Sequence, residues 1–165
     1  MPENTGKSII GFVHIEKACG TTLHHIFRSN WPLAYAHLAP RRGWTHSHGG
    51  IWRTEEAHSF LCRFPYIKGI GGHSFAPYLD YNKATGRSFK LITYLREPIS
   101  RYVSHYKYQR DVMALNRTFE AFVQSKDNDN CMVRRIAGED NVSKAIDILE
   151  EKQITVGLLE DFDRS

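Results

Sequence analysis

The sequence predicts an α/β fold of three layers, in which a mostly parallel central sheet lies between two layers of helices. Short apolar segments of strand length alternate with segments whose apolar residues have helical spacing, an order typical of parallel β–α units. The chain has 165 residues, of which 41% are hydrophobic and 24% are charged, as is ordinary for a globular protein. We therefore expect a single domain over residues 1–165.

The composition restricts the partners and the compartment. A net charge of +4 suits a nucleotide or another polyanion, but it is too small to indicate nucleic-acid binding. Cys19, Cys62 and Cys131 are widely spaced and odd in number, which indicates neither a disulfide framework nor a CxxC metal site and favours a reducing compartment. The sequence has no apolar run of membrane-spanning length and no signal-peptide core, so a chain that natively starts at Met1 is expected in the cytoplasm.

The functional prediction depends first on the segment that opens the chain. Residues 8–15 are apolar and partly β-branched, as in a buried strand, and residues 21–28 place their apolar side chains at helical spacing. The loop between them would aim backbone N–H groups and the start of a helix at one point. That arrangement favours an anion.

Four residues of this segment fit an anion. Lys17 adds a positive charge, and Gly20 permits close approach of the backbone. Thr21 and Thr22 place hydroxyl groups beside the unpaired N–H groups of the first helical turn. The alternative is an ordinary helix start after a core strand, with Lys17 simply solvated.

Residues 30–50 contain several Pro and Gly residues and are expected to form a long surface connection. Within it, His46 and His48 lack a third candidate ligand nearby, which favours a polar loop over a metal site. Thr54 is expected to cap a helix that runs to about Cys62.

A second strand is predicted over Tyr66–Ile70, and Gly71, Gly72 and His73 follow it. The carboxyl end of a strand is where α/β folds bind ligands, which makes His73 a candidate site residue. The alternative is a loop histidine hydrogen-bonded to the backbone. Residues 76–83 are then expected to be helical.

The third strand is predicted over Phe89–Leu95, whose apolar composition suits a central position, and Pro98 suits the first turn of a following helix. Arg96 lies at the end of the strand and Ser104 about two turns into the helix. Their guanidinium and hydroxyl groups could reach one anion from two sides. A surface arginine and an ordinary helix serine are the alternative. The apolar face of this helix is predicted to consist of Ile99, Tyr102, Val103 and Tyr106.

The rest of the chain continues the alternation. Helices are predicted over residues 118–125, 131–137 and 142–152, with a polar loop between the first two. A fourth strand is predicted over residues 154–159.

The two stretches that could bind an anion are residues 8–28 and residues 95–106. Together, they resemble motifs of the sulfotransferases that use 3′-phosphoadenosine 5′-phosphosulfate (PAPS), in particular the carbohydrate-acting branch typified by heparan sulfate 2-O-sulfotransferase. That family has a strand followed by a loop of the kind HIPKTGGT, and this chain has HIEKACGTTL at residues 14–23. The family's second motif is a strand, then LRDP, then Arg and Ser on a helix. Here it is LREP at residues 95–98, followed by Arg101 and Ser104. The resemblance extends from about Ile9 to Phe162 and implies the family's P-loop nucleotide-hydrolase-like fold.

The resemblance implies a role for each matching residue. The residues assigned to the nucleotide are Lys17, Gly20, Thr21 and Thr22 at the 5′-phosphosulfate, and Arg96 and Ser104 at the 3′-phosphate. His73, in a Gly-His pair between the two motifs, matches the family's acceptor-side base, and Lys17 would assist the departure of the 5′-phosphate. PAPS is the expected co-substrate and PAP the product, with no metal.

The resemblance also implies the partners. The acceptor is expected to be a hydroxyl group of a saccharide or glycan, and neither nucleic acid nor a membrane segment is expected. Homo-oligomer formation stays open. A chain whose native start lies elsewhere would be an excised Golgi-lumenal-type domain.

The chain departs from the family pattern in the loop and at its end. Glu16 replaces the usual Pro, which removes a fixed φ and places a carboxylate beside the anion site. Ala18 and Cys19 replace a Thr and a small residue. Family members continue past the last strand into a helix and a loop over the nucleotide, so the fold is expected to be short at its C-terminus.

The acceptor side is less defined. The aromatic residues that could stack on sugar rings are Trp31, Tyr35, Trp44 and Trp52, and the basic residues that could pair with acidic sugars are Arg41, Arg42 and Arg53. Packing residues and solvated charges are equally compatible with the pattern.

Two other functions are compatible with the sequence. A P-loop kinase or NTPase would need Ser or Thr after the loop lysine and a Mg²⁺-binding Asp after an apolar strand, whereas Lys17 is followed by Ala18. A PAP- or glycan-binding module without turnover would fit the altered loop.

Overall fold

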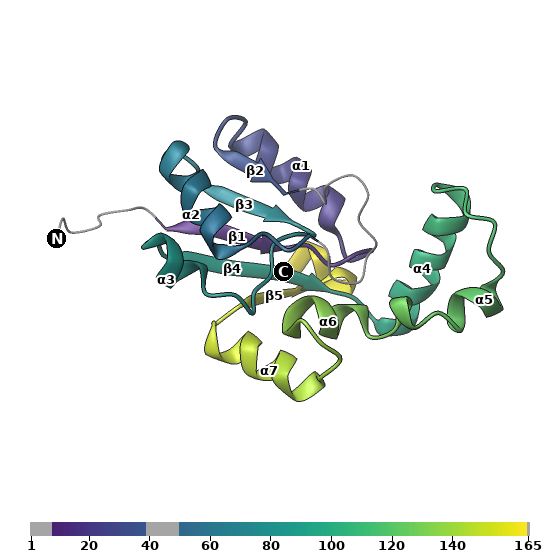
Figure 1. Cartoon of the computed structure of the whole chain (residues 1–165). Coiled ribbons are helices and arrows are strands. Elements are labelled where there is room, and N and C mark those ends of the chain that lie inside the picture. Colours follow the sequence, from purple (N-terminus) through teal and green to yellow (C-terminus); the bar gives the residue numbers. More distant parts are fainter. Residues whose placement is uncertain (1–7, 39–49, 165) are drawn as a thin grey trace.

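A computed structural model describes residues 8–38 and 50–164, in which five strands form one all-parallel sheet of order β2-β3-β1-β4-β5 (Figure 1). The strands are β1 (Ile9–Val13), β2 (Tyr35–His37), β3 (Gly69–Gly72), β4 (Phe89–Leu95) and β5 (Thr155–Leu158). The helices are α1 (Gly20–Asn30), α2 (Thr54–Arg63), α3 (Tyr81–Thr85), α4 (Pro98–Asp111), α5 (Phe119–Val123), α6 (Cys131–Ala137) and α7 (Val142–Glu151), with 3₁₀ turns η1 (Lys126–Asn128) and η2 (Leu159–Arg164). In the described residues, no helix is both long and apolar enough to cross a membrane.

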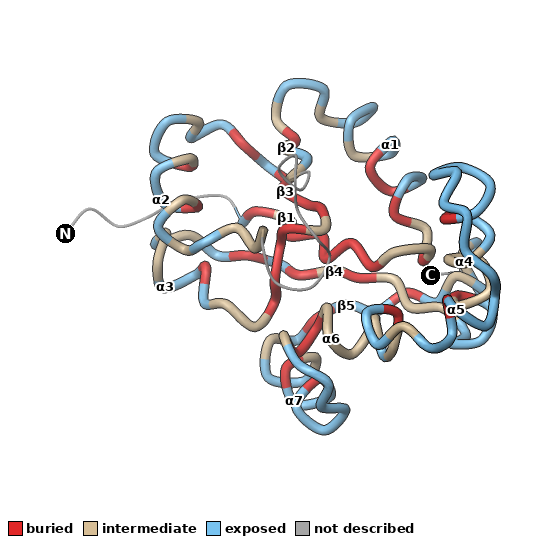
Figure 2. The backbone as a smooth tube through the Cα atoms, turned by 45° about the vertical axis from the view of Figure 1, so that its right-hand side comes forward, coloured by how far each residue is buried: buried red, intermediate tan, exposed pale blue. Residues whose placement is uncertain are grey.

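Helices cover both faces of the sheet, and the alternation of side chains along β1 shows which helix covers which face. Phe12 packs under α1, with its ring centroid 5.9 Å from that of Phe27. Ile9 and Val13 point to the opposite face, into an apolar core to which α2, α3, α6 and α7 contribute. Most residues of β1 and all of β3 are buried (Figure 2). The predicted layered α/β fold with a parallel sheet is therefore confirmed.

Strands β1, β4 and β5 lie where the sequence predicted them, whereas the edge strand β2 was not predicted. Strand β4 and helix α6 have their predicted bounds. Strand β2 lies inside the connection that was expected to be irregular, so the sheet has five strands and not four. This strand is only three residues long, and Tyr35 holds it by packing on Phe27 at 5.1 Å. Such a short edge strand has no sequence period of its own.

Two further bounds are corrected. Strand β3 begins at Gly69 and not at Tyr66, because the N–H of Ile67 donates to Phe64 O and closes a turn before the strand. Helix α3 begins at Tyr81 and not at residue 76, because the Asp80 side chain caps it by accepting from Lys83 N.

The apolar face predicted for α4 is partly wrong. Ile99 is 73% exposed, whereas Arg101 and Gln109 of the same helix are buried. Helices α4 and α5 extend beyond the carboxyl edge of the sheet (Figure 1), so α4 packs on α5 through the contact of Tyr102 with the buried Phe122. A helix that leaves the body of the fold in this way need not present its apolar face to the sheet.

Candidate functional site

The loop after β1 turns sharply before α1 begins. Lys17 and Cys19 both have left-handed backbone conformations, with φ of 65° and 63°. Gly20 follows as the first helical residue, and a Cβ there would lie 1.7 Å from Nε2 of His14. From the sequence, Gly20 is expected to permit close approach of a phosphate. The structure shows that the absent side chain first makes room for the His14 ring.

The loop after β1 is in contact with Arg96, which precedes α4, and with Tyr108 near the end of that helix. Arg96 Nη1 donates to Lys17 O at 3.3 Å, and Lys17 Nζ lies 4.4 Å from the centroid of the Tyr108 ring on α4. Strands β1 and β4 are parallel neighbours, so both segments leave the sheet at the same edge. The two stretches that the sequence analysis singled out therefore face one region of the molecule.

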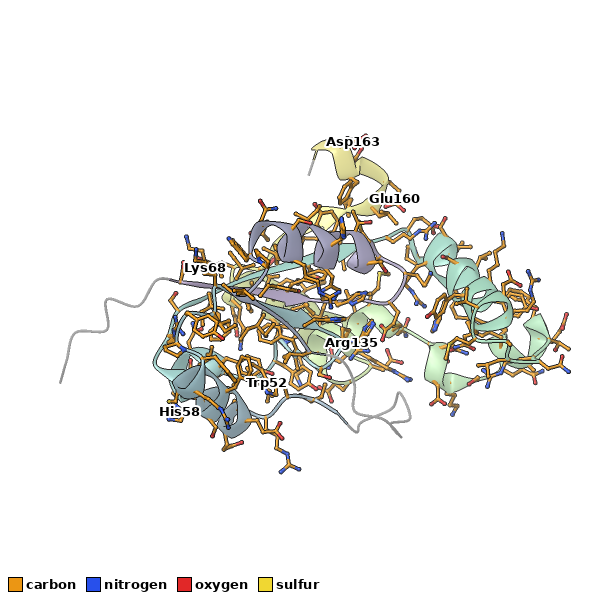
Figure 3. All side chains as sticks on the ribbon, turned by 90° about the horizontal axis from the view of Figure 1, so that it is seen from above. Trp52, His58, Lys68, Arg135, Glu160 and Asp163 are labelled. Atoms are coloured by element: carbon orange, nitrogen blue, oxygen red, sulfur yellow. The ribbon has the colours of Figure 1, made fainter. Side chains whose placement is uncertain are left out.

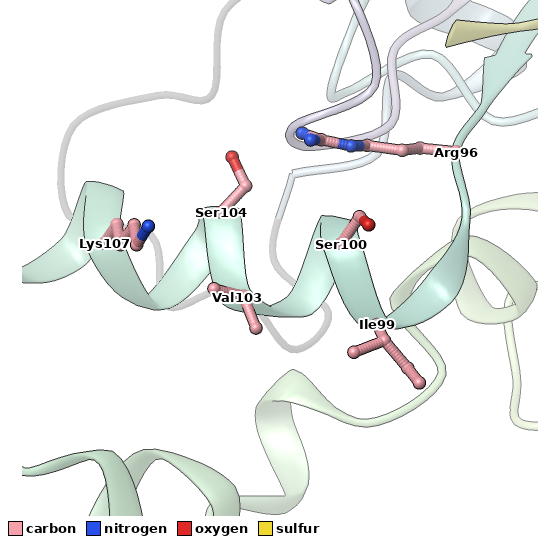
Figure 4. A pocket seen from close by; sticks show the side chains of 6 residues that line it. All are labelled: Arg96, Ile99, Ser100, Val103, Ser104 and Lys107. Atoms are coloured by element: carbon pink, nitrogen blue, oxygen red, sulfur yellow. The ribbon is translucent and has the colours of Figure 1, made fainter. Parts of the chain in front are cut away.

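Arg96 and Ser104 line one open pocket of about 400 Å³ along α4 (Figure 4). Ser100 and Ser104 point to the side of the helix on which Arg96 lies, and Val103 points away (Figure 4). Lys107 also lines this pocket. Sequence reasoning named Arg96 and Ser104 but not Ser100 or Lys107. Their i, i+4, i+7 spacing with Ser104 was the signal that could have found them.

Several guanidinium nitrogens near the two stretches have no acceptor among residues 8–38 and 50–164. The buried atoms are Arg96 Nε, Arg101 Nη1 and Arg135 Nε. A buried N–H without an acceptor is costly, so these groups favour an anionic ligand with several oxygens.

His73 follows β3 directly and faces the loop after β1. Its Nδ1 lies 3.2 Å from His14 O and 3.3 Å from Glu16 Oε1, and its ring stacks on that of His14 at 3.8 Å. The Gly72 before it has a φ of 148°, and a Cβ there would lie 2.1 Å from Leu38 O. A glycine at this position lets the chain pass under the end of β2 and present His73, which is partly exposed.

Glu16 turns away from the helix start and is held by α6. Its carboxylate accepts from Arg135 Nη2, and Cys131 Sγ donates to Oε2 at 3.1 Å. Burial alone would raise the pKa of Glu16, but Arg135, with help from His73, lowers it to about 2. The carboxylate that the sequence analysis placed beside the anion site therefore has its charge matched by Arg135 (labelled in Figure 3).

A cluster of histidines lies behind the loop. His24 Nε2 is 3.1 Å from His14 Nδ1, and His24 Nδ1 is 2.7 Å from the Tyr35 hydroxyl. Burial is the main cause that lowers the pKa of His14 to about 2 and that of His24 to about 3, so both rings are neutral at physiological pH. The cluster binds α1 to β1 and β2.

The same cluster is also the one group of potential metal ligands among the described residues. Ring nitrogens of His14, His24 and His37 lie within 4.8 Å of one another. The rings of His24 and His37 are packed over each other at 3.9 Å, and Arg28 donates to His37 Nδ1 at 2.7 Å. A cationic donor on one candidate ligand disfavours a metal cation there. These contacts support packing and hydrogen bonding in this conformation.

The aromatic residues considered for an acceptor mostly pack internally. Tyr35 is buried, Trp52 packs near Tyr81, and Trp31 stacks on Phe27. Arg53 is exposed at the start of α2. The remaining candidates, Arg41, Arg42, Trp44, His46 and His48, lie outside the described residues.

Comparison with known proteins identifies the fold. No protein-family model matches the chain, and no curated protein matches it. Among solved structures, the crystal structure of a sulfotransferase from Alicyclobacillus acidocaldarius matches with a TM-score of 0.52 at 16% identity. The alignment covers 96% of this chain and 76% of that chain. The chain thus has an α/β fold that resembles the P-loop-like fold of sulfotransferases.

The close contact of Gly20 with His14 gives a stability prediction. Gly20→Ala is expected to lower the free energy of unfolding by about 1–3 kcal/mol, because the buried His14 ring must move. Urea denaturation measures the change, with Ser29→Ala on the exposed surface of α1 as the control. In a His14→Ala background the same substitution should cost little. Equal costs in both backgrounds would contradict the clash.

The buried histidines give a pH prediction. His14 and His24 have folded pKa values far below the 6.5 of the unfolded chain. On acidification the unfolded state therefore binds protons before the folded state does, and the free energy of unfolding decreases as the pH is lowered. Between pH 7.5 and pH 5 each should cost about 2 kcal/mol of unfolding free energy.

Urea denaturation at several pH values tests this with a matched pair on α1. His24→Gln should flatten the pH dependence, whereas His25→Gln, on an exposed neighbour, should leave it unchanged. An unaltered slope in His24→Gln would show that this ring does not stay neutral in the folded protein.

Proposed function

We propose that the protein is a PAPS-dependent sulfotransferase that transfers a sulfuryl group to a hydroxyl group of a saccharide acceptor. The observation that carries the proposal is the 3.3 Å contact of Arg96 with the Lys17 carbonyl. It joins the loop that resembles a 5′-phosphosulfate site to the pocket that resembles a 3′-phosphate site. One bisphosphorylated nucleotide could then contact both.

The residues fit such a nucleotide in charge and position. At the loop, Lys17 supplies a cation, while Thr21 and Thr22 are exposed in the first turn of α1, where N–H groups and the helix dipole favour a phosphate. At the pocket, Arg96 and Ser104 would bind the 3′-phosphate. A requirement for that second phosphate would select PAPS over ATP.

His73 is proposed as the general base. PAPS, when bound, would supply the electrophilic sulfuryl group and a leaving 5′-phosphate. His73 would accept the proton of the acceptor hydroxyl at Nε2, and Lys17 would stabilise negative charge where the phosphate leaves. The net reaction moves SO₃ to the acceptor oxygen and releases PAP and one proton. Transfer of this kind depends on positioning and charge more than on covalent catalysis.

The saccharide acceptor rests on the sequence resemblance to the carbohydrate-acting branch. The site is compatible with it, since His73 is partly exposed at the carboxyl edge of the sheet. A panel of sulfate-free glycans, simple alcohols and phenols, assayed with PAPS, would identify the acceptor class.

Nucleotide affinity is the first test of the proposal. Calorimetry should show binding of PAP and much weaker binding of ATP. Arg96→Ala should weaken PAP binding about 10- to 100-fold, because a charge-assisted hydrogen bond contributes about 1.5–3 kcal/mol. Lys68→Ala, which precedes β3 at the opposite edge of the sheet, is the control (Figure 3). Equal affinity for ATP and PAP, with Mg²⁺-dependent hydrolysis of ATP, would favour an NTPase instead.

Transfer itself separates the enzyme from a binding module. Lys17→Ala and His73→Ala should each reduce sulfate transfer by at least about 10²-fold, and His73→Ala should leave the dissociation constant of PAP nearly unchanged. His58→Ala on α2 serves as the histidine control (Figure 3). Tight PAP binding by the wild type without transfer to any acceptor would identify a binding module. Full turnover in His73→Ala would point to another base, with His48 and His105 next.

A further inference from the structure

We propose that Glu16 is the positioning residue of the base, which fixes the tautomer of His73 and stabilises its protonated ring during turnover. The inference rests on the proposed function, because it assigns to Glu16 a part in that reaction. Glu16 occupies the position where the resembling loops have Pro. Its carboxylate faces the imidazole of His73 across the loop (Glu16 Oε1 to His73 Nδ1, 3.3 Å).

The contacts of His73 define its tautomer. Nδ1 faces two oxygens that can only accept, the backbone carbonyl of His14 at 3.2 Å and the carboxylate of Glu16 at 3.3 Å. Nδ1 must therefore carry the hydrogen, and the lone pair of the neutral ring lies on Nε2. A base needs this lone pair on the nitrogen that faces the acceptor. The same logic relates a carboxylate to the histidine of hydrolytic triads.

Glu16 is itself fixed from α6. Arg135 Nη2 donates to Oε1, the oxygen that also faces His73, and Cys131 Sγ donates to Oε2 at 3.1 Å. Arg135 Nη1 donates to the backbone carbonyl of His73 at 2.5 Å. One guanidinium thus ties the carboxylate and the backbone of the base together. The Glu16 carboxylate and the His73 backbone are therefore held in a fixed position relative to each other.

The arrangement suits the proton step. The O–H bond of the acceptor breaks, its proton forms a bond to His73 Nε2, and that proton later passes to solvent. Glu16 takes up no proton at any stage. Because it remains ionised, its negative charge stabilises the imidazolium that forms.

Other groups face His73 as well. In the described residues these are His14 and Glu16 from the loop after β1, His24 from α1, His37 from β2, and Arg135 from α6. Arg135 opposes the imidazolium, and the neighbouring histidines are held neutral or poorly protonated. Glu16 is the one carboxylate of this set, so removing its charge should make the ring harder to protonate.

A double-mutant cycle tests the inference. Glu16→Gln keeps an oxygen for Arg135 and His73 but removes the charge, and it should lower kcat about 10- to 100-fold. The dissociation constant of PAP should change less than about threefold. In a His73→Ala background Glu16→Gln should have no further effect on kcat, because Glu16 acts only through the base. Glu120→Gln on exposed α5 is the control and should retain wild-type turnover.

The pH profile separates positioning from a structural role. Without the carboxylate, the acid limb of kcat/KM should move to lower pH, because the base loses its proton more easily. Loss of fold alone would lower activity at all pH values and would not move the limb. Multiplicative effects in the cycle, or an unmoved limb in a folded variant, would overturn the inference.

A second variant covers the case in which Glu16→Gln leaves Arg135 unpaired and does not fold. Glu16→Asp keeps the ion pair but withdraws the carboxylate by one methylene, and should lower kcat about three- to tenfold at a nearly unchanged melting temperature. Wild-type kcat in Glu16→Asp would overturn the inference.

If the wild type binds PAP but transfers no sulfate, the proposed function fails and the inference falls with it. If the wild type turns over and the Glu16 variants match it, only the inference fails.

Discussion

The parallel pairing of β1 with β4 is the constraint on which the candidate site depends. Their register places Val13 opposite Thr93, and the buried Thr93 hydroxyl donates to Val13 O at 2.9 Å. Parallel neighbours end at the same edge of the sheet, so the loop after β1 and the helix after β4 start side by side. Arg96 then bridges them by its contact with Lys17 O. Either segment alone is an ordinary helix start, and their pairing brings the two candidate anion-binding segments together.

Where the resembling sulfotransferase loops have Pro, Glu16 provides long-range restraints in place of a local one. Pro restricts its own φ without burying a charge. A buried carboxylate is costly unless it is paired and hydrogen-bonded. The partners of Glu16 are Cys131 and Arg135, which lie 115 and 119 positions further along the chain. Buried ion pairs add little net stability compared with apolar packing, so stability is a weak reason for this one. Its geometry is the better explanation, because the same arginine also holds the backbone of His73.

The sequence was sufficient to predict the elements whose composition and end signals lie within the element itself. Strand β4 and helix α6 carry their own composition and cap signals, and both candidate anion-binding stretches have the predicted order of strand, loop and helix. The predicted position of His73 at the end of a strand is confirmed, since it directly follows β3. Strand β2, the buried face of α4 and the partners of Glu16 could not be found in this way, because each depends on contacts between distant parts of the chain. No pattern near Glu16 indicates that Arg135 will neutralise it.

The distribution of charge explains why a polyanion suits this site better than a singly charged ligand. Arg135 is matched by Glu16 within the fold, but among the ion pairs of the described residues none joins Lys17 or Arg101 to a carboxylate. Buried nitrogens of Arg96 and Arg101 also lack acceptors there. Such groups are tolerated where a ligand supplies the acceptors, since a buried unpaired donor costs about 1–3 kcal/mol. Lys17 lies in the loop after β1, whereas Arg96 lies just before α4 and Arg101 lies in the first turns of that helix. A ligand with an anionic group at each of its ends could engage both segments together.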